Sequence, residues 1–117
     1  MKRFKIMVMI IMFAVATLGT NAFCADKPLI IDVRTEPEWN EGHLEGAILI
    51  PYEKIGAGIA TVAPDKKTKI HLYCRSGRRS GIALETLRKL GYVDVTNNGS
   101  VKEAAEVLKT PVVKGSP

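Results

Sequence analysis

The sequence predicts an α/β fold in which helices flank a mainly parallel sheet. Short apolar runs typical of buried strands alternate along the chain with stretches of helical periodicity. The composition, 46% hydrophobic and 25% charged, is that of a globular protein and excludes disordered and low-complexity classes. The length of 117 residues accommodates one domain, and no internal repeat is visible.

The first predicted strand is the apolar run at residues 29–31. Thr35 and Glu38 follow with the spacing of a capping box, which predicts the start of a short helix. Gly42 is expected to end that helix. A second apolar run at residues 47–50 predicts the next strand, so the chain begins with a strand–helix–strand unit.

Residues 55–62 carry apolar side chains at helical spacing, although two glycines weaken this predicted helix. Residues 69–73 predict a third strand. A longer helix is expected over residues 80–90, with Ser80 as its N-cap. These elements continue the alternation that favours a parallel sheet.

Residues 92–96 predict a fourth strand, and the Asn-Asn-Gly sequence at residues 97–99 predicts a turn. Ser100 and Glu103 form a second capping box, which begins a last amphipathic helix. The residues from 111 to 117 are expected to form a flexible tail. The folded domain is accordingly expected to cover residues 26–110.

The first 25 residues have the pattern of a secretory signal peptide. A basic start at Lys2, Arg3 and Lys5 precedes the uncharged, mostly apolar run Ile6–Leu18, and small residues follow. This run is short for a membrane span, although an uncleaved anchor is the alternative interpretation. We expect cleavage between residues 22 and 25, export to the periplasm, and contact with the membrane only during export.

The charge that remains after such cleavage is nearly balanced. Of 17 basic and 12 acidic residues, three basic ones lie in the leader, which leaves 14 against 12. This balance gives little support for a nucleic-acid partner. The two cysteines, Cys24 and Cys74, are too few for a disulfide framework, and we expect no metal site.

The segment from Cys74 to Ser80 carries the chemistry. Cys74 ends a predicted strand just before a helix, and parallel sheets place their sites at such strand ends. The following amides and the helix N-terminus favour an anion, and three arginines add positive charge. Both influences favour a thiolate, so Cys74 is predicted to be a nucleophile toward a small anionic substrate. Gly77 allows the loop to turn tightly.

This loop, Cys-Arg-Ser-Gly-Arg-Arg-Ser, resembles the active-site loop of single-domain rhodaneses, the thiosulfate sulfurtransferases. Other segments resemble that family's N-terminal signature and later motifs, namely residues 31–34, 41–47, 50–51, 87–92 and 98–100. The similarity extends from about Leu29 to Leu108 and covers nearly the whole predicted domain.

The resemblance implies a rhodanese-like fold with a five-stranded, mainly parallel sheet flanked by helices. It implies that the Cys74 thiolate takes the sulfane sulfur of thiosulfate, releases sulfite, and passes the sulfur to cyanide or a thiol. It further implies a covalent persulfide on Cys74 and no separate cofactor.

The resemblance also implies roles for the residues around Cys74. Arg79 would bind the substrate anion or brace the loop, and the substrate-binding loop comprises Arg75, Ser76, Gly77, Arg78 and Arg79. Loop support is expected from Asp32, Arg34 and Ser80. An ordinary ion pair at the strand end is an equal alternative for Asp32 and Arg34.

Three alternatives remain open at this stage. Phosphatases and arsenate reductases of the same fold place an arginine six positions after the cysteine, where this chain has Ser80. The domain could instead carry persulfide to a partner or sense oxidants. A Cys24–Cys74 disulfide would require cleavage before Phe23.

Overall fold

The computed structural model describes residues 27–115. The predicted signal peptide lies outside these residues, as do the last two residues of the expected tail. Within the described range, no helix is long and apolar enough to cross a membrane.

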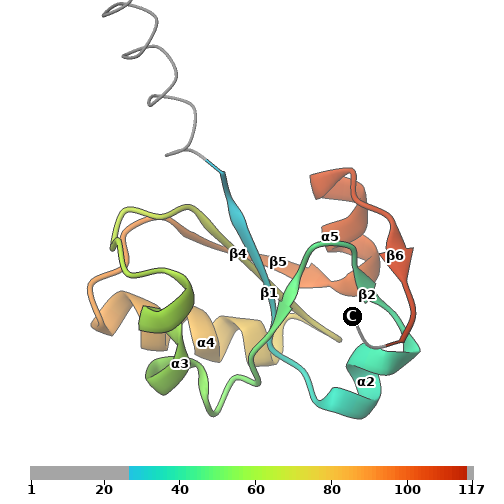
Figure 1. Ribbon diagram of the computed structural model, residues 1–117, viewed down its shortest axis with the longest axis horizontal. Helices are drawn as coiled ribbons and strands as arrows, with labels where there is room; N and C mark the ends of the chain where they lie inside the picture. Colours follow the sequence, from blue (N-terminus) through green and yellow to red (C-terminus); the bar gives the residue numbers. More distant parts are fainter. Residues whose placement is uncertain (1–26, 116–117) are drawn as a thin grey trace, which may run out of the picture.

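A four-stranded parallel sheet forms the centre of the domain (Figure 1). Its strands stand in the spatial order β3 (Ile48–Leu49), β1 (Leu29–Asp32), β4 (Ile70–Cys74) and β5 (Val95–Ser100). Each neighbouring pair is parallel. The predicted α/β class is therefore confirmed, with four strands in the main sheet of the described residues where the resemblance implied five.

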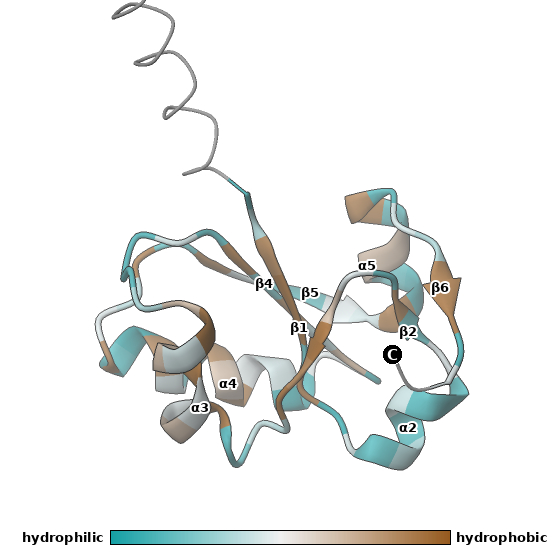
Figure 2. Cartoon of the chain, in the orientation of Figure 1, coloured by the Kyte–Doolittle hydropathy of each residue, from teal (hydrophilic) through white to brown (hydrophobic). Residues whose placement is uncertain are grey.

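Helices cover both faces of this sheet (Figure 1). On one face, α3 (Ile55–Val62) and α4 (Arg78–Lys89) pack over a core of aliphatic side chains from β1 and β4. On the other face, Ala104 of α5 (Val101–Leu108) packs with Leu44 and Tyr73. The apolar colouring of β1 and β4 in Figure 2 follows from burial on both sides.

Both predicted capping boxes are present. Before α2 (Glu36–Glu41), the Thr35 amide and hydroxyl donate to Glu38 Oε1 at 3.2 and 2.9 Å. Before α5, the Glu103 amide donates to the Ser100 hydroxyl at 3.1 Å. Side chains close in sequence thus fix where these two helices begin.

The start of α4 differs from the prediction. The helix begins at Arg78, and its N-cap is Gly77 with a φ of 95°, a left-handed conformation that favours glycine. Ser80 was expected at the N-cap but lies in the first turn, where its hydroxyl is free to contact the Cys74 loop.

The fourth strand also differs from the prediction. β5 begins at Val95 and continues through the Asn-Asn-Gly segment that was expected to turn. Asn97 is paired with Leu72 of β4, and the register shifts before Ser100 reaches Cys74. Because β5 is the outermost strand, polar side chains can remain accessible to solvent while the backbone stays in the sheet.

The prediction of a flexible tail is wrong for its first half. β6 (Val112–Val113) pairs antiparallel with β2 (His43–Leu44) in a separate two-stranded sheet. Backbone hydrogen bonds from Glu45 to Pro111 and from Gly115 to Asn40 hold this segment on both sides. Pairing with residues distant in sequence orders a stretch that carries little local signal.

Candidate active site

Cys74 is the last residue of β4, and the loop that follows it is only three residues long. The side chain is fully buried and belongs to the core on the α3–α4 face. The exposed Arg75 and Ser76 lead to Gly77, whose positive φ turns the chain back toward the sulfur. The strand end and the helix start therefore position Cys74 from both sides, as the sequence predicted.

Hydrogen-bond donors surround the sulfur. The Gly77 amide lies 2.9 Å from Cys74 Sγ, and the Ser80 hydroxyl oxygen lies 3.4 Å away. Burial, the largest single influence, would raise the pKa of the Cys74 thiol, but donation by the Ser80 hydroxyl and the amides of Ser80, Ser76 and Gly77 outweighs it. The pKa is consequently lowered, which favours the thiolate.

Arg79 is held by a carboxylate that sequence reasoning assigned only to a helix cap. Its two terminal nitrogens donate to the two oxygens of Glu38, both at 2.8 Å. This hydrogen-bonded pair lowers the pKa of Glu38 to about 2 and raises that of Arg79. Arg79 is therefore fixed in the first turn of α4, whereas Arg75 and Arg78 are exposed.

Asp32 and Arg34 form a buried ion pair beside the loop. Arg34 Nη2 lies 2.7 Å from Asp32 Oδ2 and also donates to the Gly42 carbonyl at 2.6 Å. Asp32 is paired in register with Tyr73, next to Cys74. The side-chain hydrogen bonds of Arg34 join β1 to the end of α2 and do not reach residues 75–79.

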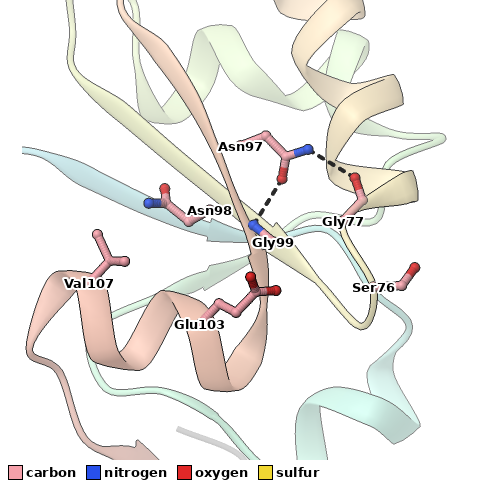
Figure 3. Close-up of a pocket in the computed structure, with 7 residues that line it drawn as sticks. All are labelled: Ser76, Gly77, Asn97, Asn98, Gly99, Glu103 and Val107. Atoms are coloured by element: carbon pink, nitrogen blue, oxygen red, sulfur yellow. Dashed lines mark hydrogen bonds between the residues drawn. The ribbon is translucent and has the colours of Figure 1, made fainter.

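Asn97 is a second residue that sequence reasoning missed, because its segment was interpreted as a turn. Its Nδ2 donates to the Gly77 carbonyl at 2.9 Å, and its Oδ1 accepts from the Gly99 amide at 3.0 Å (Figure 3). The Ser80 hydroxyl contacts the same Oδ1 at 2.6 Å. β5 thus supports the Cys74 loop through Asn97, while α2 contacts Arg79 after the loop through Glu38.

A pocket of about 480 Å³ lies between this loop, β5 and α5 (Figure 3). Its lining residues are Ser76, Gly77, Asn97, Asn98, Gly99, Glu103 and Val107. Within residues 27–115, no three His, Cys, Asp or Glu side chains gather in the manner of a metal site.

A parallel sheet with a buried cysteine at a strand end, facing the amides of a short loop, defines a class of α/β thiol proteins. Residues 20–105 match the family described as rhodanese-like domain. Thiosulfate sulfurtransferase PspE of Escherichia coli is 42% identical over 85 residues, which cover 73% of this chain and 78% of that protein. The chain belongs to the rhodanese-like domain family and is a sulfurtransferase.

Two further relatives show the range of this family. A solved structure described as a rhodanese with anions from E. coli has a TM-score of 0.70 and 40% identity, and the match covers 76% of this chain and all of that one. The probable adenylyltransferase/sulfurtransferase MoeZ of Mycobacterium tuberculosis is 41% identical over 90 residues. That match covers 74% of this chain but only 22% of MoeZ, so the domain also occurs within longer proteins.

Proposed function

We propose that this chain transfers sulfane sulfur from thiosulfate to a thiophilic acceptor through a persulfide on Cys74. The Cys74 thiolate attacks the sulfane sulfur, a new S–S bond forms, and the S–S bond of thiosulfate breaks. Sulfite leaves with the electron pair of the broken bond. No separate cofactor is required, because the transferred sulfur stays covalently attached to the protein.

In the second step, the acceptor attacks the outer sulfur of the persulfide. Cyanide gains the sulfur and becomes thiocyanate, whereas a thiol acceptor becomes a persulfide. In either case Cys74 departs as a thiolate, ready for the next donor. The same loop donors that favour the thiolate before attack favour it again as the leaving group.

The observation that carries this proposal is the 2.9 Å contact between the Gly77 amide and Cys74 Sγ. An amide aimed at the sulfur stabilises negative charge without a general base. The exposed Arg75 and Arg78 supply positive charge at the mouth of the loop, which attracts a small dianion. The name of the E. coli relative supports thiosulfate as the donor.

Intact mass spectrometry tests the proposal directly. The reduced protein should gain one sulfur atom after exposure to thiosulfate and lose it on addition of cyanide, with thiocyanate released. Cys74→Ser should take up no sulfur, whereas Cys24→Ser is the matched control and should load normally. A free Cys74 thiol that gains no sulfur from thiosulfate would overturn the choice of donor, and hydrolysis of an aryl phosphate would favour a phosphatase.

Export to the periplasm is the second part of the proposal. It is supported by the basic start and the apolar run Ile6–Leu18. The mass of the protein recovered from a periplasmic fraction should correspond to a chain cleaved between residues 22 and 25. Recovery of the uncleaved chain in the membrane fraction would contradict this part and would leave the sulfur-transfer result unaffected.

A further inference from the structure

We propose that Asn97 is a positioning residue that competes with Cys74 for the single hydroxyl proton of Ser80. The inference deepens the proposed function and rests on Cys74 as its nucleophile. Ser80 would then act as a two-position donor, turned toward Asn97 while Cys74 is a thiol and toward the sulfur when the thiolate forms.

The orientation of the Asn97 amide follows from its other partners. The Gly99 amide can only donate, so the atom it meets at 3.0 Å must be the carbonyl oxygen Oδ1. The Gly77 carbonyl can only accept, so the atom it meets at 2.9 Å must be the nitrogen. Oδ1 has no proton to give, and the 2.6 Å contact with Ser80 therefore requires the hydroxyl to donate.

Counting protons shows the competition. The buried Ser80 oxygen lies 2.6 Å from Asn97 Oδ1, 3.2 Å from the Gly77 carbonyl oxygen and 3.4 Å from Cys74 Sγ, but it carries one proton. The short contact marks the position of that proton in the present arrangement. The sulfur contact becomes the stronger one when the sulfur is charged, because a hydrogen bond to an ion is about twice as strong as a neutral one.

This arrangement gives Asn97 a definite effect on ionisation. While Cys74 is a thiol, the bond from Ser80 to Asn97 stabilises the neutral state. When the thiolate forms, the hydroxyl rotates to the sulfur, and Asn97 Oδ1 keeps the Gly99 amide as its donor. Asn97 thus keeps the pKa of Cys74 higher than it would be if Ser80 always donated to the sulfur. Once the thiolate has formed, the Ser80 hydroxyl stabilises it directly.

The charged residues near the loop do not offer a proton that can move to and from the Cys74 sulfur in the way that the Ser80 hydroxyl does. The charged side chains that the packed elements bring toward the loop have partners of their own, namely Arg79 with Glu38, Arg34 with Asp32, and Glu103 with the Ser100 amide. The α3 helix carries no charged residue, His71 of β4 contacts Asn98, and Arg75 and Arg78 are exposed. The Gly77 carbonyl, a third acceptor near the Ser80 hydroxyl, already accepts from Asn97 Nδ2 and the Gly81 amide. The Ser80 proton is therefore the neutral donor shared between Asn97 and the sulfur.

Loss of Asn97 should leave the loop in place. The Gly77 carbonyl also accepts the Gly81 amide at 3.0 Å, which is the first hydrogen bond of α4. Asn97 is exposed, so replacing it removes little buried surface. Asn97→Ala is therefore expected to fold, and its effect on the sulfur can be measured separately from stability.

The test measures the pKa of Cys74 from the pH dependence of its alkylation by iodoacetamide, in full-length protein carrying Cys24→Ser. Asn97→Ala should lower this pKa by roughly 0.5 to 1, the size expected for one neutral hydrogen bond. Alkylation at a pH below the pKa should become about 3 to 10 times faster. Thr96→Ala is the matched control from the same strand, because Thr96 is exposed and does not line the pocket, and it should leave both values unchanged.

A double-mutant cycle separates this role from simple support of the loop. In a Ser80→Ala background, Asn97→Ala should no longer move the pKa, because the shared proton is gone. An equal shift in both backgrounds, or a raised or unchanged pKa in the single variant, would overturn the inference. Alkylation requires no sulfur donor, so this result is independent of whether thiosulfate loads Cys74.

Discussion

Glu38 and Arg79 join two helices that flank the Cys74 loop, through two parallel hydrogen bonds of 2.8 Å each. Glu38 also accepts from Thr35, so one carboxylate both caps α2 and holds the arginine that follows the loop. Both side chains are less than a fifth exposed, and the pair is partly shielded from solvent. The loop is therefore anchored to α2 as well as to its own helix.

The pair should make stability depend on acidity. The pKa of Glu38 falls from 4.5 to about 2 in the folded protein, mainly through Arg79. A lowered carboxyl pKa stabilises the fold above the unfolded value and loses that effect as the pH falls toward the folded value. Glu38→Gln should cost about 1–2 kcal/mol at pH 7 after allowance for solvent screening.

Urea unfolding of Glu38→Gln and of the unchanged protein over a series of pH values measures this difference. The gap between the two proteins should shrink from pH 4.5 toward about 2. Glu36→Gln is a suitable control, because Glu36 lies in the same turn of α2 and is exposed. A gap that stays constant with pH would show that the ion pair does not contribute in this way.

Lysine should be a poor substitute for Arg79. The two parallel bonds to Glu38 require a planar fork of donors, which lysine lacks. Arg79→Lys is expected to reduce kcat/KM for sulfur transfer by about tenfold, equivalent to roughly 1.4 kcal/mol of transition-state stabilisation. Steady-state assays beside Arg88→Lys, at the exposed far end of α4, measure the effect. Equal activity of both variants would show that charge alone suffices at position 79.

Features set by neighbouring residues were predictable from the sequence. The capping boxes of Thr35 and Ser100 each depend on a partner three residues away, and both are present. Cys74 could be placed because a predicted strand precedes it and a helix follows within four residues. In these cases the local pattern contains the physical cause of the structure.

Features set by distant partners were not predictable in the same way. Glu38 and Arg79 are 41 positions apart, and Ser80 and Asn97 are 17 apart, so no local spacing indicates either contact. The pairing of Val112 and Val113 with β2 likewise depends on an edge strand nearly 70 positions earlier in the chain. A single sequence shows which residues can form hydrogen bonds. It does not show which distant residues the fold places next to them.

Replacing Gly77 with alanine should reduce both the stability of the fold and the reactivity of Cys74. Its φ of 95° disfavours any residue with a Cβ, so Gly77→Ala should cost about 1–2 kcal/mol. A backbone shift would also move the amide that contacts Cys74 Sγ, and the pKa of the thiol should rise. Thermal unfolding and the pH dependence of alkylation measure the two effects.

Gly46→Ala is the matched control for this strain. Gly46 has a φ of 81°, and nothing lies within 4 Å of the position its Cβ would take. It should lose similar stability but leave the reactivity of Cys74 unchanged. Equal reactivity in both variants would mean that the Gly77 amide does not tune the sulfur.

The buried pair of Asp32 and Arg34 should matter for stability and not for the sulfur. Asp32 is fully buried, so Arg34→Met would leave its charge without a partner and should cost about 3 kcal/mol or more. The double variant Asp32→Asn Arg34→Met removes both charges and should recover much of that loss. Because the hydrogen bonds of Arg34 run to Asp32 and Gly42, the pKa of Cys74 should be the same in the double variant as in the unchanged protein. Urea unfolding and alkylation on the same samples measure the two effects. An ion pair that only fixes the strand end would change stability alone, whereas one that braces the loop would also shift the reactivity of Cys74.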